Sequence, residues 1–164
     1  MRYLTLALFV LLAAPTAFCQ ANVGCPWLNV ATASGVLRSS EIGTMATLSE
    51  GSRAACDFVY HDGTVSRELR ITMQQVQDPT QTMTACKARC NSKASPVPAI
   101  GNEAVTCAAD TKGQTDGEQV IGRVRDQLFT VTITTSARND PSMSRDALRE
   151  KTRNIAEQVA GALF

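Results

Sequence analysis

The chain has 164 residues, of which 16 are lysine or arginine, 15 are aspartate or glutamate and six are cysteine. This even charge balance argues against nucleic acid or an anionic membrane surface as the main partner, because both require a basic excess. The length suits one ordinary globular domain with a sizeable core.

The first 21 residues have the pattern of an export signal. Arg2 gives a positive start, Leu4 to Ala14 form an uncharged apolar run, and Pro15 follows it. The run is too short to span a membrane, which takes roughly 20 apolar residues, and no later segment comes close. We therefore expect a signal peptide at 1–21 and a single exported domain at 22–164, periplasmic or extracellular and without a transmembrane segment.

The cleavage position decides how many cysteines the mature chain holds. Cleavage after Ala21 removes Cys19 and leaves five cysteines, whereas cleavage after Ala17 leaves six. We favour Ala21, because cleavage after Ala17 would place Pro15 at a position that takes small residues. Lipid attachment at Cys19 is disfavoured, because Phe18 stands where a small residue is needed. Because an exported protein meets an oxidising environment, we expect the remaining cysteines to form disulfides. An odd number of cysteines leaves one thiol unpaired.

The first half of the mature chain predicts a helix followed by three strands. Cys25-Pro26-Trp27-Leu28 opens the helix, with Pro26 in its first turn, and the helix ends near 38–40. A weak strand at 43–48 and a stronger one at 54–60 lead to Asp62-Gly63, a two-residue hairpin signal. The third strand alternates between an apolar face (Leu69, Ile71, Met73) and a polar face (Glu68, Arg70, Thr72, Gln74).

The second half predicts a short helix, three more strands and a closing helix. Asp78-Pro79-Thr80 starts the short helix, which runs to about Cys90, and 91–100 is a loop. A short strand at 104–108 precedes a hairpin of 118–125 and 128–135. Asp140-Pro141-Ser142 caps the last helix, whose apolar stripe has helical spacing: Leu148, Thr152, Ile155, Val159 and Leu163.

The resulting order, α-βββ-α-βββ-α, has no regular strand–helix alternation and so does not suit a parallel doubly wound sheet. We expect an α+β fold in which an antiparallel sheet of about six strands is packed by the N-terminal and C-terminal helices.

Four segments together resemble a known type of exported domain. They are Cys25-Pro26-Trp27-Leu28, Cys56, Ala99-Ile100-Gly101-Asn102-Glu103-Ala104 and the closing Ala160-Gly161-Ala162-Leu163-Phe164. The chain resembles small exported bacterial lipoprotein-type domains of unknown function, best known from actinobacteria, with a PsbP/Mog1-like α+β sandwich. The resemblance implies a disulfide between Cys25 and Cys56 and carries no catalytic residues. The lipid-attachment motif is absent here, and the group Cys86, Cys90 and Cys107 is additional.

The three additional cysteines allow two interpretations. Cys86 and Cys90 lie one helical turn apart, and Cys107 follows in the next strand. A structural bridge would join Cys107 to Cys90, or to Cys86 as the close second choice, because direct bridging of Cys86 to Cys90 on one helical face has poor geometry. With Cys90 bridged, Cys86 is the free thiol. The alternative is a thiolate site for a soft metal or for redox work, with Met83 nearby.

Two further groups are candidate functional residues. His61, the single histidine, could serve as a general base for a serine, but it lies beside a hairpin turn and no hydrolase motif accompanies it. The outward face of the sheet offers arginine forks and threonine hydroxyls that suit an anionic or sugar-like ligand or a partner protein. Its members are Arg70, Thr72, Arg123, Arg125, Thr130, Thr132 and Thr134.

The sequence therefore favours an exported cell-envelope domain that binds a small ligand or a protein partner without catalysis and needs no cofactor. The alternative function is a thiol-dependent metal-binding or redox protein that uses Cys86, Cys90 and Cys107.

Overall fold

The fold is described from a computed structural model, which covers residues 24–39, 42–48, 53–90, 94–109, 116–137 and 140–164. The expected signal peptide at 1–21, with Cys19, lies outside these residues. Within these described residues, three helices and seven strands follow one another: α1 (Val30–Leu37), β1 (Gly43–Leu48), β2 (Arg53–Asp62), β3 (Val65–Gln75), α2 (Pro79–Ala88), β4 (Ser95–Pro96), β5 (Glu103–Ala108), β6 (Asp116–Val124), β7 (Gln127–Thr135) and α3 (Arg145–Gly161).

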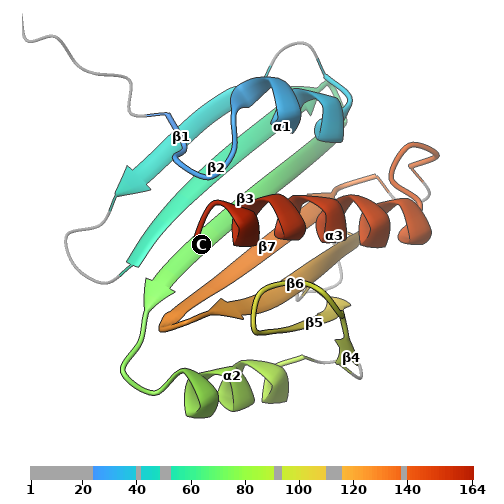
Figure 1. The fold of residues 1–164 in the computed structure, drawn as a ribbon. Coiled ribbons are helices and arrows are strands. Elements are labelled where there is room, and N and C mark those ends of the chain that lie inside the picture. Colours follow the sequence, from blue (N-terminus) through green and yellow to red (C-terminus); the bar gives the residue numbers. More distant parts are fainter. Residues whose placement is uncertain (1–23, 40–41, 49–52, 91–93, 110–115, 138–139) are drawn as a thin grey trace, which may run out of the picture.

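The strands form one antiparallel sheet in the order β1-β2-β3-β7-β6-β5-β4 (Figure 1). Every neighbouring pair is antiparallel, and β3 is joined to β7 across the middle of the sheet, with Ile71 opposite Val131. The α+β class with an antiparallel sheet is thus confirmed. The two-residue strand β4 is additional to the expected elements, and it lies in the segment for which the sequence predicted only a loop.

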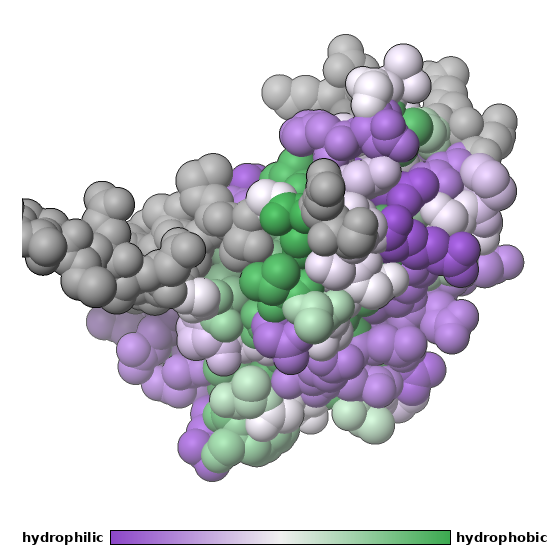
Figure 2. Space-filling view, turned by 90° about the horizontal axis from the view of Figure 1, so that it is seen from above, coloured by the Kyte–Doolittle hydropathy of each residue, from purple (hydrophilic) through white to green (hydrophobic). Residues whose placement is uncertain are grey.

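Helices α1 and α3 cover one face of the sheet (Figure 1), and the main core lies between them and the strands. Alternate residues of the inner strands supply this face, as the period of two requires: Phe58, Leu69, Ile71, Val120, Phe129, Val131 and Ile133. From α3 come Leu148, Ile155 and Val159. Seen from above, hydrophobic residues form a band through the molecule between hydrophilic surfaces (Figure 2).

Helix α2 packs on the opposite face of the sheet, near its β5–β6–β7 end. Met83 contacts Val105, Ile121 and Leu128, which alternate with the residues that face α3. The expected cap is present, because the Asp78 carboxylate accepts a hydrogen bond from the backbone N–H of Gln81 at 2.9 Å. The remainder of this face, over β2 and β3, is not covered by a helix of the described chain.

The first helix begins later than the sequence predicted. Cys25–Leu28 is not helical, and α1 starts at Val30 because Asn29 caps it, its Oδ1 accepting from the N–H of Thr32 at 2.8 Å. Asparagine is among the best N-cap residues, whereas Pro26 only tolerates a helix start. The prediction that Cys25–Leu28 opens the helix is therefore wrong.

The β2–β3 hairpin turns one residue later than expected. The two turn residues are Gly63 and Thr64, and Asp62 pairs with Val65 at the end of the strands. Gly63 has a φ of 52°, and a positive φ at the first turn position is what a type II′ hairpin requires of glycine.

The closing helix is capped by Ser144 and not by Asp140, which corrects the sequence prediction. The Ser144 hydroxyl accepts from the N–H of Ala147 at 3.4 Å. Asp140 instead lies buried ahead of the helix and forms an ion pair with Arg67 of β3 at 2.8 Å. Sequence spacing could not separate these two polar residues, because both stand just before the same helix.

The Arg67–Asp140 pair joins three parts of the fold. Asp140 also accepts from both the N–H and the hydroxyl of Ser142, at 2.9 and 2.8 Å. Arg67 donates to the carbonyl of Leu37 at the end of α1 and lies 5.6 Å from the ring centroid of Tyr60. The pair therefore fixes α1 and the start of α3 on the sheet.

We expect this network to weaken in acid. Burial alone would raise the pKa of Asp140, but hydrogen bonds from Ser142 and Arg67, with the positive charge of Arg67, outweigh it and hold the pKa below its ordinary value. A carboxyl group whose pKa is lowered on folding stabilises the protein at pH values above its unfolded pKa of about 4. This stability is lost as the pH falls through the folded pKa.

The measurement is the free energy of unfolding in urea at pH 7, 5, 4 and 3. It should fall more steeply below pH 4 for the wild type than for Asp140→Asn, which has no carboxyl to protonate here. Equal slopes for the two proteins would contradict this role.

Candidate functional site

The structure brings five of the predicted sheet-face residues together. Arg70 lies opposite Thr132 and Thr72 lies opposite Thr130, across the β3–β7 pair. Their side chains are on the face away from α3, as the alternation predicted. Thr134 follows on the same face of β7, opposite Glu68.

The two other arginines of that set do not join this group. Arg125 lies in the β6–β7 turn with a φ of 55°, outside the strand in which the sequence placed it. Arg123 is opposite Leu128, at the end of the face where α2 packs. The expected surface is therefore wrong for Arg125, whereas Arg123 keeps its predicted face, at the end where α2 packs.

The charge of the remaining arginine is already compensated. Arg70 Nε lies 2.5 Å from Asp57 Oδ1 and 3.4 Å from Glu68 Oε1. The hydrogen bond to Asp57 raises the pKa of Arg70 above its ordinary value, although burial opposes it. Arg70 thus faces two carboxylates, so the three groups together carry a net negative charge, and this part of the sheet does not attract an anion.

The cysteines form two disulfides in the described chain, and both have the expected partners. Cys25 is bonded to Cys56, which joins the segment before α1 to the sheet, with the Cα atoms 5.7 Å apart. Cys90 is bonded to Cys107, which joins the end of α2 to β5, with the Cα atoms 6.0 Å apart. Cys86 is in neither disulfide and is partly buried beside Met83.

These disulfides remove two of the three ligands from the alternative thiol site. With Cys90 and Cys107 bonded to each other, Cys86 is left as a single thiol, and a soft-metal site needs several thiolates. Among the described residues there is no group of three or more histidine, cysteine, aspartate or glutamate side chains that could hold a metal ion. His61 lies exposed at the end of β2, opposite Ser66, with no hydrogen bond to a serine in the described part of the chain.

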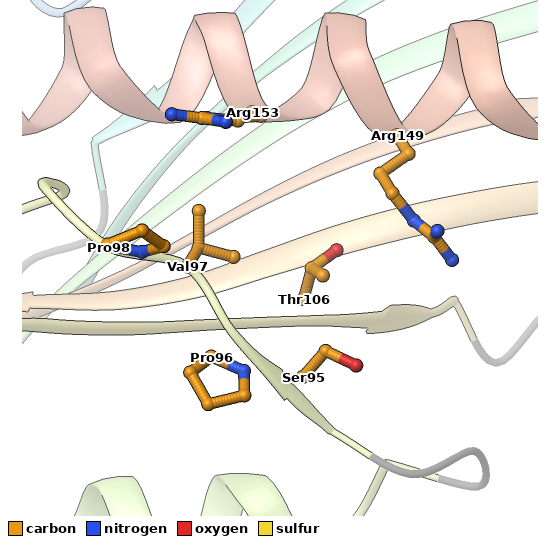
Figure 3. Close-up of a pocket in the computed structure, with 7 residues that line it drawn as sticks. All are labelled: Ser95, Pro96, Val97, Pro98, Thr106, Arg149 and Arg153. Carbon is orange, nitrogen blue, oxygen red and sulfur yellow. The ribbon is translucent and has the colours of Figure 1, made fainter.

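A pocket of about 220 Å³ lies between the β4–β5 edge of the sheet and helix α3 (Figure 3). We call it the arginine pocket, because two guanidinium groups line it, those of Arg149 and Arg153. Its other lining residues come from the edge strands and the segment after β4: Ser95, Pro96, Val97, Pro98 and Thr106. It is open to solvent on one side.

Arg149 forms an ion pair with a buried carboxylate beside the pocket. Its Nε lies 3.5 Å from Glu118 Oε1, and the Glu118 side chain is only 5% exposed. Thr106 donates its hydroxyl to the same Glu118 oxygen at 2.6 Å. In Figure 3 the Arg149 side chain extends from α3 toward Thr106 and Ser95. The Arg149 side chain is 58% exposed, and its two terminal guanidinium nitrogens have no ion pair among the described residues.

Arg153 is one helical turn further along α3, on the same side as Arg149, and lines the same pocket. Its Nε pairs with Glu157 at 3.0 Å, on the exposed surface of the helix. Arginine carries five N–H donors in a planar fork, so one ion pair at Nε leaves donors that can reach a ligand.

The rim of the pocket opposite α3 is formed by Ser95–Pro98, and several interactions fix it. Pro96 and Pro98 have restricted backbones, and the N–H of Val97 donates to the carbonyl of Ala104 at 2.9 Å. The Cys90–Cys107 disulfide fixes the chain just before the rim to the strand behind it. The pocket is therefore largely formed before a ligand arrives, which lowers the cost of ordering on binding.

Gly101 closes the turn between the rim and β5 and tolerates no side chain. Its φ is 60°, and a Cβ atom there would lie 2.4 Å from the carbonyl oxygen of Arg123. We expect Gly101→Ala to lower the free energy of unfolding by about 2 kcal/mol, from backbone strain and this clash. Urea denaturation measures this effect. Gly35→Ala in α1, where a Cβ meets nothing within 4 Å, is the control and should be neutral or stabilising.

Comparison of the chain with protein-family models, with characterised proteins and with solved structures finds no match. The resemblance to exported lipoprotein-type domains therefore stays a prediction, and the candidate site is defined by its geometry alone. No helix among the described residues combines the length and the apolar character needed to cross a membrane.

Sequence reasoning missed the arginine pocket. The helical pattern places Arg149 and Arg153 on the solvent-exposed side of an amphipathic helix. No neighbouring residue in the sequence indicates that the proline segment would lie opposite them. The available signal was their spacing of four residues beside Leu148 and Thr152 of the apolar stripe, which places both at the border of the buried face.

Proposed function

We propose that this protein is an exported cell-envelope domain that binds, without catalysis, a small ligand carrying an acidic group. The observation that carries the proposal is the arginine pocket, where two guanidinium groups from one helix face a rigid proline rim across about 220 Å³. Ligand sites are concave and largely preformed and combine apolar walls with a few polar groups, and this pocket combines a proline rim with two arginines.

Two observations support export and a binding role. The two disulfides fit an oxidising compartment, as does the signal-like start of the sequence. The histidine and the free thiol lie apart from the pocket, on β2 and α2, and the pocket lining contains neither. The polar sheet face has paired charges and gives less support for capture of a partner.

The test is a titration of the disulfide-bonded protein with small anions at pH 7 and constant ionic strength. Acetate, isovalerate, succinate, phosphate and sulfate are added singly, and the backbone N–H signals of Val97 and Thr106 are followed by NMR. We expect at least one anion to shift both signals saturably. The double variant Arg149→Gln/Arg153→Gln should bind that anion at least about tenfold more weakly, because charge-assisted hydrogen bonds are lost.

Arg145→Gln is the matched control. Arg145 is exposed in the first turn of the same helix and does not line the pocket, so this variant should bind as the wild type does. If no anion of the panel shifts the pocket signals, or if the double variant binds as tightly as the wild type, the proposed function is wrong.

A further inference from the structure

We infer that the arginine pocket selects a compact monocarboxylic acid with a short branched or cyclic apolar body, in preference to phosphate, sulfate or a dicarboxylate. This inference rests on the proposed function and names the ligand class of the same site. Four features of the pocket carry it: its charge balance, its guanidinium geometry, its apolar wall and its size.

The charge balance favours a ligand with a single negative charge. Arg149 is paired with Glu118 and Arg153 with Glu157, so the four groups sum to zero. Glu118 is buried, and its negative charge is poorly screened by solvent. A doubly charged phosphate or a dicarboxylate would bring a second negative charge close to Glu118, and that repulsion opposes binding. A monocarboxylate adds one charge, which pairs with Arg149 in a pocket that Arg153 also lines.

The guanidinium geometry matches a carboxylate. Arginine presents parallel N–H donors in a plane, which bind both oxygens of a carboxylate at once. Figure 3 shows the Arg149 side chain reaching over the pocket beside the hydroxyls of Thr106 and Ser95, with Arg153 on the adjoining turn of α3. In the same view Arg153 lies along α3 and its tip points away from Arg149, so the carboxylate would pair with Arg149 below the helix, while Arg153 adds a second positive charge to the lining.

The wall opposite the arginines is apolar. Pro96, Val97 and Pro98 line it, and Val97 belongs to the main hydrophobic core with only 9% of its surface exposed. In Figure 3 the Val97 side chain points toward α3, into the space between the rim and the helix. An acid without an apolar body would leave this wall in contact with water, so a short hydrocarbon group adds affinity.

The size of the pocket limits that body. A volume of about 220 Å³ is below the roughly 300–1,000 Å³ of sites for drug-sized ligands. This volume favours a small acid over a drug-sized ligand. Isovalerate, which has a short branched hydrocarbon body and one carboxylate, is the probe we choose from that class.

The test compares isovalerate with three probes, each of which changes one property. Isovaleramide removes the charge and keeps the shape, acetate removes most of the apolar body, and inorganic phosphate changes the anion. Dissociation constants come from NMR titration of the Val97 and Thr106 N–H signals in the disulfide-bonded protein, at pH 7 and fixed ionic strength. We expect each of the three probes to bind at least about tenfold more weakly than isovalerate.

Arg153→Gln is the primary variant, because its partner Glu157 is exposed and the substitution leaves no buried charge unpaired. It should weaken the binding of isovalerate several-fold, because a positive charge of the pocket lining is lost, and it should leave isovaleramide unchanged. Arg145→Gln should leave both unchanged.

The outcomes separate this inference from the proposed function. If phosphate binds as tightly as isovalerate, or if acetate or isovaleramide does, the inferred ligand class is wrong while the pocket remains an anion or small-ligand site. If neither isovalerate nor any anion of the wider panel shifts the pocket signals, the proposed function fails and the inference fails with it.

Discussion

Asp140→Asn is expected to lower the free energy of unfolding by about 3–5 kcal/mol at pH 7, which is the cost of leaving one partner of a buried ion pair alone. Arg67 and Asp140 have side chains only 14% and 4% exposed, and their closest atoms are 2.8 Å apart. The asparagine keeps the shape of the side chain but removes the charge that faces Arg67. The guanidinium then keeps its hydrogen bond to Leu37 without a counter-ion.

Urea denaturation of the disulfide-bonded protein measures this effect. Glu157→Gln is the matched control, since it removes an acidic partner from an exposed i,i+4 pair, which is worth about 0.3–0.5 kcal/mol. If Asp140→Asn costs no more than Glu157→Gln, the buried pair does not stabilise the positions of α1 and α3.

A lysine of α3 adds a further positive charge near the Arg67–Asp140 pair. Lys151 of α3 donates to the carbonyl of Val36 at 2.5 Å. Burial and the positive charges of Arg38 and Arg67 lower the pKa of Lys151. The negative charges of Asp140 and Glu150 oppose this lowering, so removal of the Asp140 charge affects Lys151 as well as Arg67.

Local chemistry was sufficient to predict the elements whose signals are contained within a few residues. The Asp78 cap predicted the start of α2, and the alternation of Leu69, Ile71 and Met73 predicted which face of β3 is buried. The disulfide partners followed from the resemblance for Cys25–Cys56 and from spacing for Cys90–Cys107, although spacing alone also allowed Cys86.

Signals that compete at close range misled the prediction. Asn29 and Pro26 both can begin a helix, and Asp140 and Ser144 both can cap one. In each case the outcome depended on contacts with distant parts of the chain. Cys25 is bonded to Cys56, and Asp140 is paired with Arg67, so neither segment was available to the helix.

The arginine pocket could not be predicted because its parts meet only after the sheet has formed. The rim at Ser95–Pro98 and the arginines of α3 are about fifty residues apart in sequence, and the register of β5 on β6 brings Thr106 and Glu118 together beneath them. Hydrophobic periodicity reports which side of an element is buried, but it does not report which polar residues of two elements face each other.

Removal of the Cys90–Cys107 disulfide is expected to lower both stability and ligand affinity. Its two cysteines are 17 residues apart, for which the chain-entropy relation predicts a loss of about 3 kcal/mol in the free energy of unfolding. Cys107 is buried at 4% exposure, so we choose alanine to avoid placing a hydroxyl there. The variant is Cys90→Ala/Cys107→Ala, measured by urea denaturation.

The reference protein and the double variant should both carry Cys86→Ser. Cys86 is in no disulfide and is only partly buried, so this change alone should cost little, and it prevents a thiol of α2 from forming a new bond. Intact mass before and after alkylation then checks that Cys25–Cys56 is retained. A loss of stability below about 1 kcal/mol would contradict the stabilising role of the second disulfide.

The same pair of proteins tests whether the disulfide prepares the pocket. Ser95 and Pro96 follow Cys90 within six residues, so loss of the bond frees the rim that faces Arg149 and Arg153. A mobile rim must be ordered when the ligand binds, and the affinity falls by the cost of that ordering. We expect isovalerate to bind several-fold more weakly under conditions where the variant is still fully folded. Unchanged affinity would show that the two prolines and the Val97–Ala104 hydrogen bond hold the rim by themselves.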